Sequence, residues 1–150
     1  MGCSIHFHTE VKINGTWHHH AEARIQRNYP VFAKMANVRN AGNIIIPLSL
    51  PKGIPPDATD LTKFQYKAWE ADAHSPSWLN PTEITELHRW IETFGQNEFW
   101  KDEFLPSPKQ WIDNNFPTFN GYHLHEELLN NEYYKNTGLE DVRYIFWFDN

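Results

Sequence analysis

Cysteine is almost absent from this chain of 150 residues, in which Cys3 is the only one. A single thiol excludes an intrachain disulfide and fits a reducing compartment. The sequence also lacks a secretory signal peptide and any apolar run long enough to cross a bilayer. We therefore expect a cytoplasmic protein with no membrane partner, in which Cys3 is a small buried hydrophobe rather than a nucleophile.

Positive charge is also scarce, because 13 Lys and Arg face 19 Asp and Glu, for a net charge of -6. This balance excludes a nonspecific grip on long nucleic acid, which depends on neutralising many phosphates. A small anionic ligand held by a few cations remains compatible with it. Aromatic residues make up 15% of the chain, which predicts an aromatic core with some rings left for a binding surface.

The hydrophobic pattern predicts a single α+β domain over residues 1–150, with a small antiparallel sheet covered by about four helices. We expect strands at residues 3–13, 16–25 and 141–149 and helices at 29–38, 60–71, 81–95 and 122–134, with shorter aromatic helices within 97–114. Asn14-Gly15 is a strong hairpin signal, and Asn80 with Glu83 is a variant capping box. Residues 39–58 are expected to be irregular, with a short edge strand at 43–50, and residues 72–79 to form a loop.

The first ten residues, MGCSIHFHTE, alternate like a strand and place His6, His8 and Glu10 on one face. The last strand is apolar on both faces, which predicts a central position beside the first strand, with Asp149 close to the two imidazoles. His6, His8, Glu10 and Asp149 are therefore candidate ligands for a divalent metal, zinc or manganese, with room for Asp72 or His74 in the shell. The alternative is a solvated strand whose polar face is rich in histidine.

The segment Asp72-Ala73-His74-Ser75 offers a second candidate catalytic group. His74 can act as a general base or acid, with Asp72 orienting it, and His6 and His8 complete the predicted catalytic set. The alternative is that Asp72 and Ser75 only organise a turn.

Four further residues are candidate ligand contacts. Arg24 and Arg39 can clamp a phosphate, Ser75 can donate to it, and Trp78 can stack on a base. Solvated arginines and a core tryptophan are the alternatives.

The remaining histidines are assigned structural roles. Of the run His18-His19-His20, only the first and third share a strand face, so metal binding is not favoured. His88 follows the apolar stripe of its helix and is expected to pack there. His123 and His125 are expected at the surface.

Several motifs taken together resemble a family of small proteins of bacteriophages and related bacterial elements. These are the opening Met-Gly-Cys-Ser-Ile-His, Arg39-Asn40, the block Asp72 to Leu79, and the closing Phe-Trp-Phe-Asp-Asn. Many members carry Asp where this chain has Ser4, which argues against a carboxylate role at that position. The resemblance implies a phage protein working in the host cytoplasm and brings no established mechanism.

Three functions follow as hypotheses. The first is a phosphodiesterase that destroys a small cyclic oligonucleotide used by the host as an immune signal, through a His/Asp/Glu site. The second is a protein that sequesters the same nucleotide without cleaving it, for which a homo-oligomer would enclose more of the ligand. The third is a phage protein that binds a host protein. The first two require that His6 and His74 share one pocket.

Overall fold

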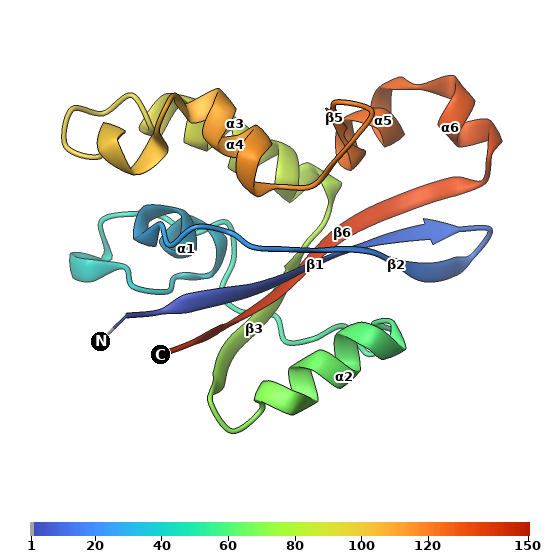
Figure 1. Ribbon diagram of the computed structural model, residues 1–150, viewed down its shortest axis with the longest axis horizontal. Helices are drawn as coiled ribbons and strands as arrows, with labels where there is room; N and C mark the ends of the chain where they lie inside the picture. Colours follow the sequence, from blue (N-terminus) through green and yellow to red (C-terminus); the bar gives the residue numbers. More distant parts are fainter. Residues whose placement is uncertain (1) are drawn as a thin grey trace.

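The computed structural model describes residues 2–150 as a four-stranded antiparallel sheet with helices on both faces (Figure 1). The strand order is β2-β1-β6-β3. The sheet strands are β1 (Ser4–Ile13), β2 (Thr16–Ala23), β3 (Ala73–Leu79) and β6 (Leu139–Asp149). The helices are α1 (Tyr29–Ala36), α2 (Asp60–Trp69), α3 (Pro81–Phe94), α4 (Pro108–Asn115), α5 (Leu124–Asn130) and α6 (Glu132–Asn136). The predicted α+β class is confirmed.

Two features of the sheet agree with the sequence prediction, the turn between the first two strands and the position of the last strand. Asn14 and Gly15 both have positive φ, 48° and 81°, as a two-residue hairpin turn requires, and they join β1 to β2. β6 lies between β1 and β3, so its expected central position is confirmed. Because Ser4 pairs with Asp149, the two ends of the described chain lie side by side (Figure 1).

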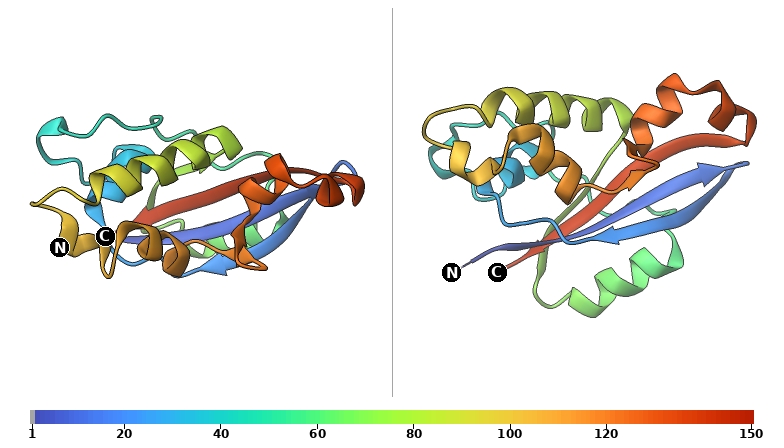
Figure 2. Two further views of the ribbon diagram at one scale, coloured as in Figure 1. Left: turned by 90° about the horizontal axis from the view of Figure 1, so that it is seen from above. Right: turned by 45° about the horizontal axis from the view of Figure 1, so that its top comes forward.

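The two faces of the sheet are covered unequally (Figure 2). The face that carries Phe7, Tyr144 and Phe146 packs against α1, α3 and α4 and forms the main aromatic core. The Phe7 ring lies 4.7 Å from Tyr144 and 5.6 Å from Phe116 between ring centroids, in edge-on contacts that aromatic pairs prefer. The opposite face is covered by α2 alone, which we call the α2 face.

Helix α3 begins as its sequence predicts. The Asn80 side chain accepts a hydrogen bond from the Glu83 backbone N–H, and the Glu83 carboxylate accepts one from the Asn80 backbone N–H. Ile84, Leu87 and Ile91 then enter the core on successive turns. The capping box is therefore confirmed.

The expected loop at residues 72–79 is instead strand β3, at the edge of the sheet. Pro76 cannot donate a ladder hydrogen bond, but an edge strand tolerates it when the strand bulges. The pairing with β6 shifts between His74 and Ser77, and Ser75 has a φ of 54°. Because of the bulge, the segment pairs with β6 both before and after Pro76, although a proline at this position is typical of a loop.

Other expected boundaries also change. Residues 39–58 are irregular apart from a short 3-10 turn at Ala41–Asn43, and no strand forms at 43–50. The helix expected at 122–134 is divided into α5 and α6, because Asn131 is extended and caps α6 through the Tyr133 N–H. A two-residue hairpin, β4 (Thr118–Phe119) with β5 (Tyr122–His123), precedes them. Across residues 2–150, none of the helices has the length and apolarity that a bilayer crossing requires.

A buried ion pair attaches α2 to the sheet. Nε and Nη2 of Arg143 donate to Oε1 of Glu10 at 3.1 and 2.8 Å, and the Glu10 side chain is fully buried. Oε2 of Glu10 accepts from the Thr59 N–H and from the hydroxyls of Thr59 and Thr62, at the start of α2. Glu10 therefore caps a helix from another part of the chain and places a negative charge at its positive end. The Trp17 ring covers the guanidinium at 3.7 Å.

We predict that Glu10→Gln lowers the free energy of unfolding at pH 7 by about 1.5–3 kcal/mol, because it weakens the buried charge-assisted hydrogen bonds from Arg143 and leaves that cation with only one carboxylate, Asp57, at 2.7 Å. Burial raises the pKa of Glu10, but hydrogen bonds from Thr59, Thr62 and Arg143 lower it by a larger amount. The pKa of Glu10 therefore lies below its ordinary value. Since a depressed carboxyl pKa stabilises the fold only above that value, the difference between the two proteins should shrink as pH falls below about 4.5. Urea unfolding measures both effects. Glu132→Gln, at an exposed position, is the matched control and should change stability by less than about 0.5 kcal/mol; an equal loss in both variants would contradict the assignment.

Candidate functional site

The predicted contact between Asp149 and the histidines of β1 is confirmed for His6. Nε2 of His6 lies 2.5 Å from Oδ2 of Asp149, on the α2 face. About a fifth of each side chain is exposed, 19% and 21%, so the pair can be reached from solvent. In the tautomer that carries its proton on Nε2, the ring donates to the carboxylate, and Nδ1 keeps a lone pair that can accept a proton. This is the geometry of an oriented general base.

The same histidine lines a cleft with another predicted residue. His6 and Arg24 border a cavity of about 410 Å³, together with Ser4, Glu22 and Trp69. The Trp69 ring, at the end of α2, lies 4.3 Å from the His6 ring and is 39% exposed. The cleft therefore combines an imidazole, a cation and an accessible aromatic face. We call it the His6 cleft.

Two other predicted residues of the α2 face are unsuited to contact a ligand. His8 is fully buried, and its Nδ1 is 2.9 Å from Nε2 of His19. Both carboxylate oxygens of Glu10 are engaged by Arg143 and the start of α2. Within residues 2–150, no group of three or more His, Cys, Asp and Glu side chains is placed to hold a metal ion. The structure thus does not bring His6, His8, Glu10 and Asp149 together as a metal site.

The expectation that His6 and His74 share a pocket is wrong. His6 pairs with Trp147 and His74 pairs with Phe148, and successive residues of a strand point to opposite faces. The His6 ring stacks on Trp147 on the α2 face, whereas the His74 ring stacks on Phe148, which packs against α1. The sheet itself separates the two imidazoles.

His74 forms a separate group with other predicted residues. Its Nε2 lies 3.1 Å from Oδ1 of Asn150, and its Nδ1 lies 3.0 Å from the Ser75 hydroxyl. Arg39 donates to the same Asn150 oxygen at 3.3 Å. Asp72 is exposed and takes no part in orienting His74, so that predicted role passes to Asn150 and Ser75.

Trp78 is not free to stack on a base. The ammonium of Lys52 lies 3.9 Å from the centre of its ring, and Trp78 pairs with Ile145. It is half-buried and does not line the His6 cleft. The aromatic face in that cleft is Trp69, which carries no distinguishing local signal in the sequence.

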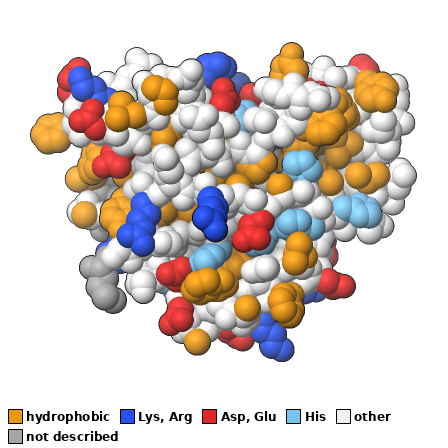
Figure 3. Space-filling model, viewed as in Figure 1, with side chains coloured by type: hydrophobic (Ala, Val, Ile, Leu, Met, Phe, Trp, Pro, Cys, Tyr) orange, Lys and Arg blue, Asp and Glu red, His pale blue; other side chains and the backbone are white. Residues whose placement is uncertain are grey.

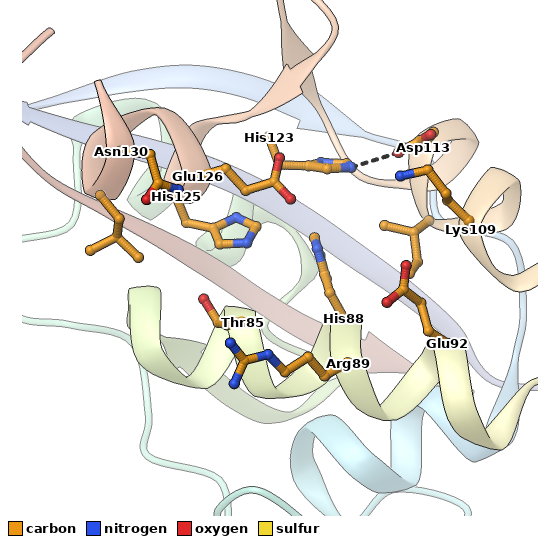
Figure 4. Close-up of a pocket in the computed structure, with 12 residues that line it drawn as sticks. Thr85, His88, Arg89, Glu92, Lys109, Asp113, His123, His125, Glu126 and Asn130 are labelled. Atoms are coloured by element: carbon orange, nitrogen blue, oxygen red, sulfur yellow. Dashed lines mark hydrogen bonds and ion pairs between the residues drawn. The ribbon is translucent and has the colours of Figure 1, made fainter. Parts of the chain in front are cut away.

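A second cluster of histidines was missed by the sequence analysis (Figure 4). His88, His123 and His125 line a cavity of about 390 Å³ between α3, α4 and α5, on the core face of the sheet. The His88 ring lies 4.8 Å from each of the other two rings. His123 and His125 are 4% and 3% exposed, so their expected surface position is wrong. His88 packs on Phe116 and Tyr144, as expected from its helical stripe.

The three imidazoles lie in different environments. Burial, with smaller contributions from the other two histidines, lowers the pKa of His88 well below its ordinary value. Burial and the nearby His123 lower the pKa of His125 to about 4. His123 has an acceptor at each ring nitrogen, the Asp113 carboxylate at 2.9 Å and the Pro117 carbonyl at 3.2 Å. At neutral pH, His88 and His125 are therefore uncharged.

Histidine side chains are also exposed on the outer surface of the molecule. Figure 3 shows them in a band across the face that β2 crosses, beside acidic and basic side chains. His18 is exposed, whereas His20 is half-buried and lies 3.0 Å from the Thr9 hydroxyl. We assign these two residues no site.

Comparison of the chain with protein-family models, with curated proteins and with solved structures gives no match. The function is therefore inferred from the geometry of the chain itself.

We predict that the protein loses stability as pH falls from about 6.5 toward 4. Burial lowers the pKa of His8 to about 4, more than the nearby Glu22 raises it, and His88 and His125 are shifted in the same direction. In this window the unfolded chain binds more protons than the folded one, so the free energy of unfolding decreases as the pH is lowered.

Urea unfolding at intervals from pH 7.5 to 4.5 measures this slope. His8→Asn should make it shallower, and His18→Asn, at an exposed position on β2, should leave it unchanged. A flat profile between pH 6.5 and 4.5 would show that the buried imidazoles titrate alike in the folded and unfolded chain.

Proposed function

We propose that the protein is a phosphodiesterase that binds a small nucleotide in the His6 cleft, through a different site from the one that the sequence predicted. The shared pocket of His6 and His74 that the sequence-based hypothesis required is not formed, and this proposal uses His6 without His74. The observation that carries this proposal is that His6 of β1, held by Asp149, and Arg24, which follows β2, border one cavity with the exposed face of Trp69. These are the parts that phosphodiester cleavage needs: a proton acceptor, a cation for the phosphate, and a surface for a base.

The charge of the cleft limits the ligand. Arg24 and Glu22 both line it and carry opposite charges. Since these two charges cancel, the cleft suits a phosphodiester, with one negative charge per phosphate, better than a di- or triphosphate. The volume of about 410 Å³ lies in the range of small-molecule sites. The substrate class we assign is a cyclic di- or trinucleotide, of which one nucleotide enters the cleft.

The reaction follows from the His6–Asp149 pair. Nδ1 of His6 accepts a proton from water while the water oxygen forms a bond to phosphorus. The bond from phosphorus to the ribose oxygen breaks, and the imidazolium returns the proton to that oxygen. The Asp149 carboxylate keeps Nε2 protonated and stabilises the transient positive charge on the ring. Arg24 neutralises charge on the phosphate oxygens.

The wider role is a proposal that depends on the resemblance to phage proteins. In that context, the enzyme would remove a cyclic oligonucleotide that the host cell uses as an immune signal. Sequestration without cleavage by the same cleft is the alternative, and it needs Arg24 and Trp69 but no proton transfer.

We predict that the purified protein linearises at least one member of a panel of cyclic di- and trinucleotides, assayed with and without manganese. His6→Asn should lower kcat/KM at least 100-fold, because it removes the proton acceptor. Arg24→Gln should mainly raise KM. His18→Asn is the matched control on the neighbouring strand and should keep wild-type activity. Chromatography of the products and calorimetry separate the outcomes: ligand that binds and is recovered intact supports sequestration, and a panel that neither binds nor is cleaved overturns both.

A further inference from the structure

The cavity lined by His88, His123 and His125 has the features of a second ligand site, independent of the His6 cleft. It lies on the core face of the sheet, whereas the His6 cleft lies on the α2 face. Its volume of about 390 Å³ is sufficient for a small molecule. Figure 4 shows the His125 ring directed into the space above α3, beside His88 and Thr85.

An unsatisfied polar atom points to a missing partner in this cavity. The His125 side chain is only 3% exposed, and its Nδ1 is buried without a hydrogen-bond partner among residues 2–150. An unpaired buried polar atom is unfavourable, because it has lost its hydrogen bond to water without gaining one from the protein. The other rings are engaged: Nε2 of His88 lies 3.4 Å from the Tyr144 hydroxyl, and His123 has Asp113 and Pro117. A ligand that donates a hydrogen bond to Nδ1 of His125 would satisfy this atom.

The charges around the cavity are balanced. Asp113 is paired with His123, which leaves Arg89 and Lys109 opposite Glu92 and Glu126. None of these four side chains forms an ion pair with another described residue. His88 and His125 add no charge at neutral pH. A polyanion or polycation would meet as much repulsion as attraction, whereas a molecule with one charge of each sign is accommodated.

We propose that this cavity binds a small zwitterion, an apolar α-amino acid. Its ammonium donates to His125 and faces Glu126, and its carboxylate faces Arg89. Ile112 and Leu129 also line the cavity and provide apolar contact for a branched side chain. We call this the zwitterion site.

The experiment uses the full-length protein with its histidines labelled with ¹⁵N. Three probes of matched shape are titrated: L-leucine, 4-methylpentanoate, which lacks the ammonium, and 3-methylbutylamine, which lacks the carboxylate. We expect L-leucine to shift the Nδ1 signal of His125 with saturation and to bind at least tenfold tighter than either singly charged probe. If all three probes leave the His125 signals unchanged, or if one singly charged probe binds as tightly as leucine, the proposal is overturned.

Two variants test the assigned contacts without removing buried atoms. Glu126→Gln should weaken L-leucine at least tenfold and abolish its preference over 4-methylpentanoate. Arg89→Gln should weaken it similarly and abolish its preference over 3-methylbutylamine. The matched controls Glu132→Gln and Lys63→Gln, both at exposed positions, should bind like the wild type. Unchanged leucine affinity in both test variants would also overturn the proposal. Because this site and the His6 cleft lie on opposite faces, the result is independent of nucleotide cleavage.

Discussion

The buried pair formed by Glu10 and Arg143 is the interaction on which the α2 face depends. A buried ion pair contributes little net stability, because the cost of removing both charges from water offsets their attraction. Once both charges are buried, however, removing one of them is strongly destabilising. Here the carboxylate has a further function, since it also holds the start of α2 through Thr59 and Thr62. The other end of α2 carries Trp69, which packs on His6. The position of the exposed tryptophan in the His6 cleft is therefore set by an interaction at the far end of its helix.

The alternation of β6 determines which functional groups can meet. Trp147 and Phe148 are neighbours in sequence but face opposite layers, so the histidines that pair with them are directed apart. The result is a molecule with its polar chemistry divided between two faces. Asp149 forms a hydrogen bond with His6 on one face, and Asn150 forms hydrogen bonds with His74 and Arg39 on the other.

Local patterns were sufficient to predict much of the fold. The Asn14-Gly15 turn, the capping box at Asn80 and the central position of the last strand each follow from a few adjacent residues, and all are confirmed. β3 was missed because Pro76 and the small polar residues around it are typical of a loop, and only pairing with β6 makes the segment a strand. This is a tertiary effect that local propensity does not report.

The candidate sites show the same division. The contact between His6 and Asp149 follows from alternation and strand pairing, and it could be predicted. The cavity around His88 could not, because His123 and His125 reach it only through the turn between α4 and α5. One signal was available: His88 lies within the buried stripe Ile84, Leu87, Ile91 of its helix, and a buried imidazole needs polar partners. Such partners come from elsewhere in the fold, which the sequence alone does not identify.

The pairing of the first strand with the last also affects how the protein can assemble. His6 and Asp149 are separated by 143 positions along the chain, and every ladder bond between β1 and β6 closes a similarly long loop. The hairpin of β1 and β2 can form while synthesis is still under way, but one side of β1 stays without its neighbour until residues 139–149 have left the ribosome. Folding rates fall as contacts become more distant in sequence. The centre of the sheet is therefore completed last, and the exposed side of the nascent hairpin is where a chaperone would be expected to act.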